Sequence, residues 1–254
     1  MTILPHLPEE LIHAAYAKAA GKELESGKFN SPESSAALAA NVFGYFCAAG
    51  KAPEFPRHGH FPFLTTPVES LNLERSLRFP WSGGRHPWLD AVIETRDWLV
   101  GIESKRFEPF RDTKSNGFSD AYDRDMWGPG MRAYDSVREA IKSGAIRFKF
   151  LDAVQLVKHA YGICTQARTA KKAALVYVYA EPRCFPGGRV ILNREIGEHR
   201  DEIRRFTDLV SGAEVRFSSL SHASLNEEFA VSESPDLVLH AKAVRAAFLS
   251  EQYS

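Results

Sequence analysis

Two apolar, β-rich runs separated by only two polar residues constrain this chain more than any other feature. The runs span residues 88–95 and 98–107, and Arg96 and Asp97 lie between them. Runs of β-branched and aromatic residues on either side of a short polar turn predict a β-hairpin. The Arg-Asp turn lacks the glycine that the tightest hairpin turns prefer, which leaves the loop length open by one residue. We therefore expect an antiparallel strand pair near the centre of the fold.

Charged side chains occupy defined positions in this hairpin. If the turn is centred on the polar dipeptide, Asp90 faces Glu103 across the two strands, about 5.5 Å apart between Cβ atoms. Residues two apart share a strand face, so Glu103 and Lys105 point one way and Ser104 points the other. Two facing, partly desolvated carboxylates repel each other and need positive charge nearby. Lys105 supplies one charge, and Mg²⁺ or Mn²⁺ would supply the rest through Asp90, Glu103, a strand carbonyl at Ser104 and waters.

Such a group of residues has a recognisable chemistry. A divalent cation polarises a phosphoryl oxygen and acidifies water, while a lysine orients that water or offsets developing negative charge. This combination favours phosphodiester hydrolysis. Paired carboxylates also serve glycoside hydrolysis, but Lys105 would then have less to do. A structural cross-strand charge cluster is the other interpretation. Asp112 and Lys114 repeat the short pattern in aperiodic polar sequence, where a solvated loop is the better interpretation.

Asp90, followed thirteen residues later by Glu103-Ser104-Lys105, resembles the active-site motif of the PD-(D/E)XK nuclease superfamily. The segments 71–74 and 101–109 are similar to a bacterial restriction-endonuclease-like group, and the resemblance covers roughly residues 31–182. It implies that Asp90 and Glu103 bind the metal and that Lys105 is the catalytic lysine. The first residue of the motif, commonly proline, is Leu89 here.

The resemblance also implies that flanking segments lend polar groups to the site. The superfamily often adds an acidic residue from its first helix, and Glu33 and Glu74 are the candidates. Gln155 and Lys158, which share a helix face with His159, are carried over as catalytic neighbours. Gln155 does not have the Gln-x-x-x-Tyr spacing of one well-known branch.

The rest of the chain alternates helical and strand-like segments. Helices are predicted over 8–20, 31–49 with Ser31 as N-cap, 132–142, 151–168, from Asn193 and from Ser234; strands are predicted over 71–79, 174–180 and 214–220. Residues 108–131 predict a long loop. This order indicates an α/β fold with a restriction-endonuclease-like mixed β-sheet core flanked by helices. We expect residues 1–30 to be a helical appendage and residues 31–254 to form one domain.

Charge is balanced overall and uneven locally. The 32 Lys and Arg residues cancel the 32 Asp and Glu residues, which argues against bulk electrostatic binding to a polyanion or a membrane. Residues 142–172 carry seven basic residues against one acidic residue, and residues 194–254 carry eleven acidic against seven basic. The basic segment suits contacts to a phosphate backbone, although a solvated helix face is an equal alternative.

The chain shows no pattern for export or membrane insertion. Its apolar run at 173–180 is far shorter than the roughly 20 residues of a membrane-spanning helix. We expect no signal peptide, because the N-terminal residues lack a basic region followed by an apolar one, and three cysteines without a CxxC pair fit reduced, packing thiols. His58 and His60 have no second pair at zinc-ligand spacing and are interpreted as loop residues. We expect a cytoplasmic protein.

These observations together predict a Mg²⁺- or Mn²⁺-dependent nuclease that hydrolyses nucleic acid, DNA rather than RNA, with a metal-activated water. A catalytically inactive domain of the same fold, which binds nucleic acid or a protein partner, is the alternative. A hydrolase of small phosphoesters is a third class. No membrane partner is expected, and a homodimer or a protein partner remains open.

Overall fold

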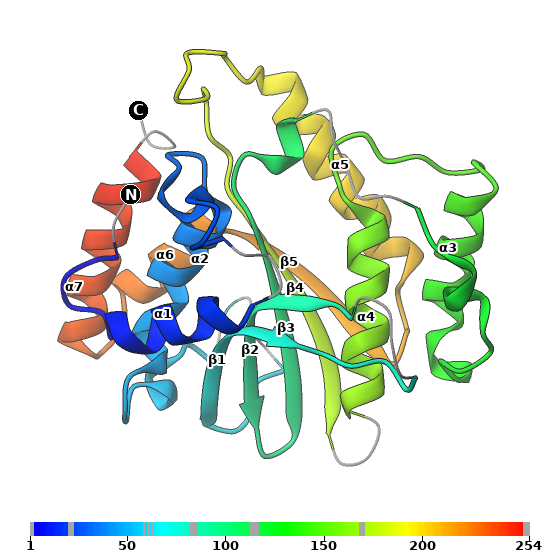
Figure 1. The fold of residues 1–254 in the computed structure, drawn as a ribbon, viewed down its shortest axis with the longest axis horizontal. Helices are drawn as coiled ribbons and strands as arrows, with labels where there is room; N and C mark the ends of the chain where they lie inside the picture. The colour runs from blue at the N-terminus through cyan, green and yellow to red at the C-terminus, as the bar shows by residue number, and fades with distance from the viewer. Residues whose placement is uncertain are drawn as a thin grey trace.

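The computed structural model describes residues 3–19, 23–57, 59, 61, 63–81, 86–111, 117–167 and 171–250. These residues build a mixed α/β fold around one five-stranded sheet (Figure 1). The strands are β1 (Val68–Ser76), β2 (Trp88–Thr95), β3 (Trp98–Lys105), β4 (Lys172–Tyr179) and β5 (Val215–Ser221). The helices are α1 (Glu9–Lys18), α2 (Ser35–Phe43), α3 (Arg132–Lys142), α4 (Ala153–Ala167), α5 (Asn193–Leu209), α6 (His222–Ala230) and α7 (Pro235–Val244).

The sheet follows the chain order β1-β2-β3-β4-β5. Its first two pairings are antiparallel, and the β3–β4 and β4–β5 pairings are parallel. Parallel neighbours need a crossover connection, and α4 and α5 lie in the two crossovers. The predicted mixed sheet flanked by helices is therefore confirmed.

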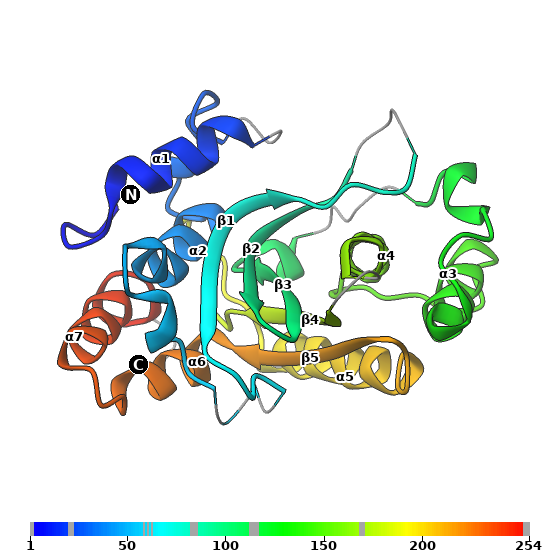
Figure 2. The same ribbon diagram turned by 90° about the horizontal axis from the view of Figure 1, so that it is seen from below.

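Helices cover both faces of the sheet (Figure 2). On one face α1, α2, α6 and α7 enclose a large apolar core that includes Ile93, Ile102 and Val176. On the other face α3, α4 and α5 enclose a second core that includes Val92 and Leu175. A sheet buried on both sides explains why β3 and β4 read as almost continuous apolar runs.

The predicted hairpin has the predicted register. Arg96 and Asp97 form the two-residue turn between β2 and β3, and Glu94 pairs with Leu99 next to it. The ladder runs to the pair Ala91 and Ile102. Beyond that pair β2 continues beside β1, and β3 continues beside β4, so the sheet forks at this end.

Several predicted boundaries are wrong. The second helix begins at Ser35, because Ser34 rather than Ser31 caps it: the Ser34 Oγ accepts a hydrogen bond from Ala37 N at 3.0 Å. It ends at Phe43 and continues as a 3₁₀ turn over Gly44–Cys47. The predicted strand 71–79 lies at Val68–Ser76.

Helix α6 was missing from the predicted elements altogether. Ser221 caps it, and its buried residues His222, Leu225, Asn226 and Phe229 follow helical spacing. Two polar residues within that stripe hid the apolar period from sequence inspection. Short 3₁₀ turns at Glu108–Phe110, Asp120–Asp123 and Pro129–Met131 interrupt the segment predicted as a loop.

Three further expectations can be compared with the structure. Ile12 and Tyr16 of α1 belong to the same core as α2, so the first helix packs against the body of the molecule. The three cysteines are free, as predicted, and His199 is a fully buried core residue. In the described part of the chain, no helix has the length and apolar character needed to cross a membrane.

Candidate functional site

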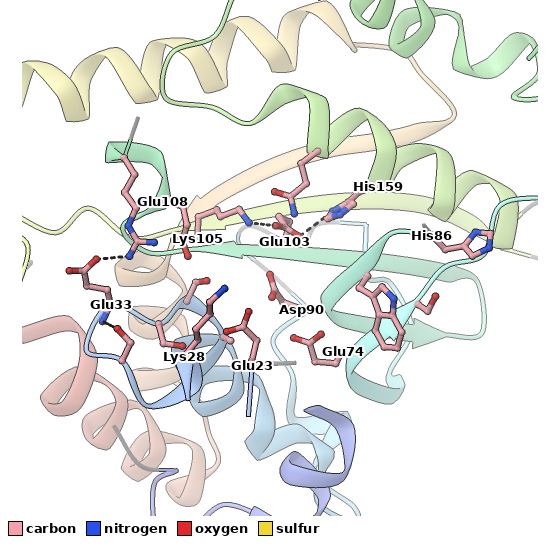
Figure 3. A pocket seen from close by; sticks show the side chains of 18 of the residues that line it. Glu23, Lys28, Glu33, Glu74, His86, Asp90, Glu103, Lys105, Glu108 and His159 are labelled. Atoms are coloured by element: carbon pink, nitrogen blue, oxygen red, sulfur yellow. Dashed lines mark hydrogen bonds and ion pairs between the residues drawn. The ribbon is translucent and has the colours of Figure 1, made fainter. Parts of the chain in front are cut away.

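Three carboxylates occupy one row across the antiparallel half of the sheet. Glu74 lies between the β1 residues that pair with Leu89 and Ala91, which places it opposite Asp90. Continuing the β2–β3 register places Glu103 on the other side of Asp90. Figure 3 shows Asp90 between Glu103 and Glu74, as this register requires. The row lies where the sheet forks.

Glu103 is the most enclosed member of the row, and its side chain is 3% exposed. One carboxylate oxygen forms an ion pair with Lys105 Nζ, and the other lies 3.1 Å from Nδ1 of His159 on α4. Burial alone would raise the pKa of Glu103, but Lys105 and His159 outweigh it and lower this pKa to about 2. Glu103 is therefore ionised at neutral pH.

Lys105 is held as a cation. Burial opposes its charge, but Glu103, Asp90 and Glu108 together raise the pKa of Lys105 well above its usual range. Glu103 and Lys105 point to the same face of β3, as the strand period predicts. An ammonium group this stable does not act as a general base at neutral pH, and it places a positive charge beside Glu103.

Burial and neighbouring negative charge disfavour the ionised forms of Asp90 and Glu74. Burial and the neighbouring Glu103 raise the pKa of Asp90 well above its usual range. Burial and the charge of Glu103 also raise the pKa of Glu74 to about 7. Glu74 adopts φ 48°, the one positive φ among the described residues other than glycine. Such a conformation costs on the order of 1 to 3 kcal/mol and is retained where the surroundings require it.

The main chain of Ser104 also takes part in the site. Its N–H donates a hydrogen bond to Asp90 Oδ2 at 2.6 Å. The N–H and C=O of one strand residue point towards the same neighbouring strand, so the Ser104 carbonyl also faces β2. Its side chain points to the opposite face, where Oγ lies 2.9 Å from Nε2 of His222. Burial and then Arg106 lower the pKa of His222 to about 3, which keeps this histidine neutral.

A cavity of about 1040 Å³ opens over the row (Figure 3). The sheet and α4 form one side of it, and the segment from Glu23 to the first turn of α2 forms the other. Acidic residues predominate in its lining: Glu23, Glu33, Glu74, Asp90, Glu103 and Glu108. The basic lining residues are Lys28, Arg78, Lys105 and Arg111. The first turn of α2 also lines the cavity with Ser34, Ser35 and Ala36.

The structure distinguishes between the two candidates for a third acidic residue. Glu33 and Glu74 both line the cavity. Glu33 forms an ion pair with Arg111 at 2.5 Å, whereas Glu74 lies in register beside Asp90. Glu74 is therefore the better placed of the two to share a cation with Asp90.

The predicted helix face reaches the site only in part. Gln155 lines the cavity together with His159, but Lys158 does not. Lys158 Nζ instead donates to Gly117 O at 3.2 Å and lies above the ring of Tyr122. On a helix, residues 155 and 159 lie about 40° apart, whereas residue 158 is turned to the flank. His159 is thus the helix residue that contacts Glu103, whereas the sequence analysis named Gln155 and Lys158 as the catalytic neighbours.

The basic segment 142–172 does not surround the cavity. Of its basic residues that the structure describes, none is among the lining residues. Lys142 pairs with Asp123, and Lys171 pairs with Glu94. His58, His60, Asp112 and Lys114 lie outside the described residues.

The donor set fits a hard divalent cation held by few protein ligands. Within the residues described, no group of three or more His, Cys, Asp or Glu side chains converges as a ready-made metal cage. Mg²⁺ typically uses one or two carboxylates and keeps several waters, and Asp90 and Glu103 offer such oxygens beside the Ser104 carbonyl. A cation beside these carboxylates would favour the ionised forms of Asp90 and Glu74, which burial and the charge of Glu103 disfavour.

Comparisons with protein-family models, curated proteins and solved structures gave no match for this chain.

Proposed function

We propose that this protein is a metal-dependent nuclease of restriction-endonuclease-like fold that hydrolyses phosphodiester bonds, most effectively in DNA. The observation that carries this proposal is the arrangement of Asp90, Glu103 and Lys105 at the fork of the sheet, facing an open cavity. The two carboxylates can bind a divalent cation, and the charged lysine can stabilise negative charge on a phosphoryl group.

Opposite walls of the cavity have complementary properties. The carboxylates on the sheet side attract a cation. The first turn of α2 lines the cavity and presents the positive end of the helix dipole, which favours an anion. Lys28 and Arg111 add positive charge among the lining residues. A phosphodiester with a bound cation would place its cation beside the carboxylates and its negative charge beside α2.

A divalent cation held by Asp90, Glu103 and the Ser104 carbonyl would polarise the phosphoryl group and make a water acidic enough to attack it. Lys105 then places its charge where negative charge develops on the phosphoryl oxygens. His159 fixes the carboxylate of Glu103 from the α4 side, so that the ligand does not rotate away. Glu74 sits close enough in the row to respond to the charge on Asp90.

The test measures cleavage by the purified full chain with Mg²⁺ and with Mn²⁺, on single- and double-stranded DNA and RNA. We expect cation-dependent cleavage that falls about 100-fold or more in Asp90→Ala, Glu103→Ala and Lys105→Ala. Asp208→Ala, a change at an exposed position of α5, is the matched control and should retain activity. Intact substrates under all these conditions, together with no cation binding by calorimetry, would refute the proposal.

One observation favours a second candidate, a catalytically inactive domain of the same architecture. Both carboxylate oxygens of Glu103 already contact cationic or hydrogen-bonding groups of the protein, Lys105 and His159. In that case the wild-type protein would show no cation-dependent turnover, and Lys105→Ala would only reduce its stability. Nucleic-acid binding that is insensitive to Asp90→Ala, in the absence of cleavage, would identify this candidate.

A further inference from the structure

Trp88 lines the cavity and, unlike the other three tryptophans, makes no contact with another aromatic ring among the described residues. Trp81 stacks on Phe79 at 4.7 Å between ring centroids, Trp98 packs on Phe63 at 5.2 Å, and Trp127 stacks on Tyr161 at 4.0 Å. Trp88 makes no such ring contact within the described parts of the chain, and it is half-buried. A large aromatic side chain left unstacked in a polar cavity needs a physical explanation.

The position of this indole relates it to the carboxylates. Trp88 and Asp90 are two residues apart on β2, so about 7 Å of strand separates them. Ser76, the β1 partner of Trp88, also lines the cavity. The indole therefore lies next to the place where a phosphodiester would be cleaved.

Polar groups suited to a nucleotide surround the same end of the cavity. Arg78 and His86 both line it. His86 Nδ1 accepts a hydrogen bond from Phe79 N at 3.1 Å, which leaves Nε2 to carry the ring proton as a donor. A neutral sugar would need an aromatic surface but not the cations Arg78, Lys105 and Lys28 that also line the cavity. A nucleotide would use both.

We propose that Trp88 is the stacking platform for an unpaired nucleobase, and that the substrate enters the cavity as single-stranded nucleic acid. The inference rests on the proposed nuclease function and adds a substrate class to it. Aromatic side chains bind single strands by stacking on base faces, which are occupied by neighbouring bases inside a duplex. A nucleotide flipped out of a duplex presents the same face, so the experiment separates these two sources.

Binding is measured with short fluorescent oligonucleotides in EDTA, which prevents cleavage, and cleavage is measured separately with Mg²⁺. Single-stranded DNA and RNA, a duplex of the same sequence, and a strand whose nucleotides lack bases are compared. We expect the single strands to bind more tightly than the duplex and the base-free strand. Trp88→Ala should weaken binding of the single strands by about 5-fold to 100-fold, with little change for the base-free strand. Trp81→Ala, outside the cavity lining, is the matched control.

Trp88→Phe retains a ring and guards against misfolding of the alanine variant. A base stacked on the Trp88 indole quenches its fluorescence, so quenching by a single strand should disappear in Trp88→Phe and persist in Trp81→Phe. Equal binding by wild type and Trp88→Ala would overturn the inference, as would an equal loss on the base-free strand. Tighter binding of the duplex would overturn single-strand entry and indicate a flipped nucleotide.

The outcomes also separate this inference from the proposed function. Cation-dependent cleavage of duplex that does not depend on Trp88 would overturn the inference and leave the nuclease intact. Base-dependent binding at Trp88 without cleavage of any nucleic acid would contradict the nuclease and retain the stacking platform.

Discussion

At the scale of single residues, the site depends on charges that are stable only as a group. Glu103 is almost fully buried, and the side chain of Lys105 is 17% exposed. Removing one member of a buried ion pair leaves the other charge without compensation, whereas removing both costs much less. Stability and catalysis therefore make separable demands on the same two side chains.

Lys105→Ala should lower the free energy of unfolding by about 3 kcal/mol, because it leaves the Glu103 carboxylate buried with His159 as its main remaining partner. The double variant Glu103→Gln/Lys105→Met should cost clearly less than the sum of the single changes. Urea denaturation of wild type, Glu103→Gln, Lys105→Met and the double variant at neutral pH measures this coupling. Additive effects would show that the pair is not coupled in the folded protein.

The central part of the site could be predicted from the sequence, because a strand has an exact two-residue period and the two-residue turn fixes its register. Asp90, Glu103 and Lys105 follow from those two facts. His159 and Lys158 are adjacent on one helix, and only the rotation of α4 against the sheet decides which of them reaches Glu103. That rotation depends on packing between elements distant in the chain.

At the scale of elements, the approach of α4 to the sheet determines the geometry of the cavity. Gly162 of α4 lies against the segment that precedes β2. A Cβ atom at position 162 would lie 2.6 Å from Pro87 Cγ and 3.3 Å from Leu77 O. The missing side chain thus allows the chain that carries His86 and Trp88 to pack directly on the helix.

Gly162→Ala should destabilise the protein by about 1 to 2 kcal/mol, because the clash outweighs the gain in helix propensity. Gly197→Ala on α5 is the matched control, since a Cβ atom there would meet nothing within 4 Å. It should stabilise the protein by about 0.5 to 1 kcal/mol. Thermal unfolding of both variants, followed by circular dichroism, gives the comparison. A stabilising Gly162→Ala would contradict the close packing described for α4.

Elements with strong local signals were predicted well, and elements defined by tertiary contacts were not. The bounds of α3 were predicted correctly from its pattern and its following glycine. The start of α2 was misplaced because Ser31 and Ser34 are both good capping residues, and only the structure shows which one the chain uses. Helix α6 was not predicted because the polar residues His222 and Asn226 interrupt the apolar pattern of its buried face.

At the scale of the whole molecule, His240 joins three distant segments. Its Nδ1 lies 2.9 Å from His6 Nε2, its Nε2 lies 3.2 Å from Val42 O, and its ring stacks on Tyr45 at 4.8 Å. These contacts connect the N-terminal segment, α2 with its following turn, and α7. Burial lowers the pKa of His240 to about 4, with a smaller lowering effect from His6 and a raising effect from the Val42 carbonyl.

His240 should therefore contribute a loss of stability as the solution is acidified. A neutral buried histidine has its full stabilising effect above its unfolded pKa of about 6.5 and loses it as the pH falls towards 4. At pH 5 the loss from His240 is about 2 kcal/mol. Urea denaturation at pH 7 and pH 5 should show a smaller decrease in His240→Gln than in wild type. An identical decrease in both proteins would exclude His240 as the source.

The fork in the sheet has one more consequence. Past Ala91 and Ile102, β2 and β3 each have one strand neighbour among the described residues, so the peptide groups that face each other across the fork are not paired in a β2–β3 ladder. The Asp90 carboxylate takes over one of these groups, the Ser104 amide. A ligand bound in the fork would bridge the ends of β2 and β3, and so would connect the two halves of the sheet. Ligand binding would then stabilise the backbone of both strands at the fork. Slower amide hydrogen exchange in the last residues of β3 and the first residues of β2 would report it.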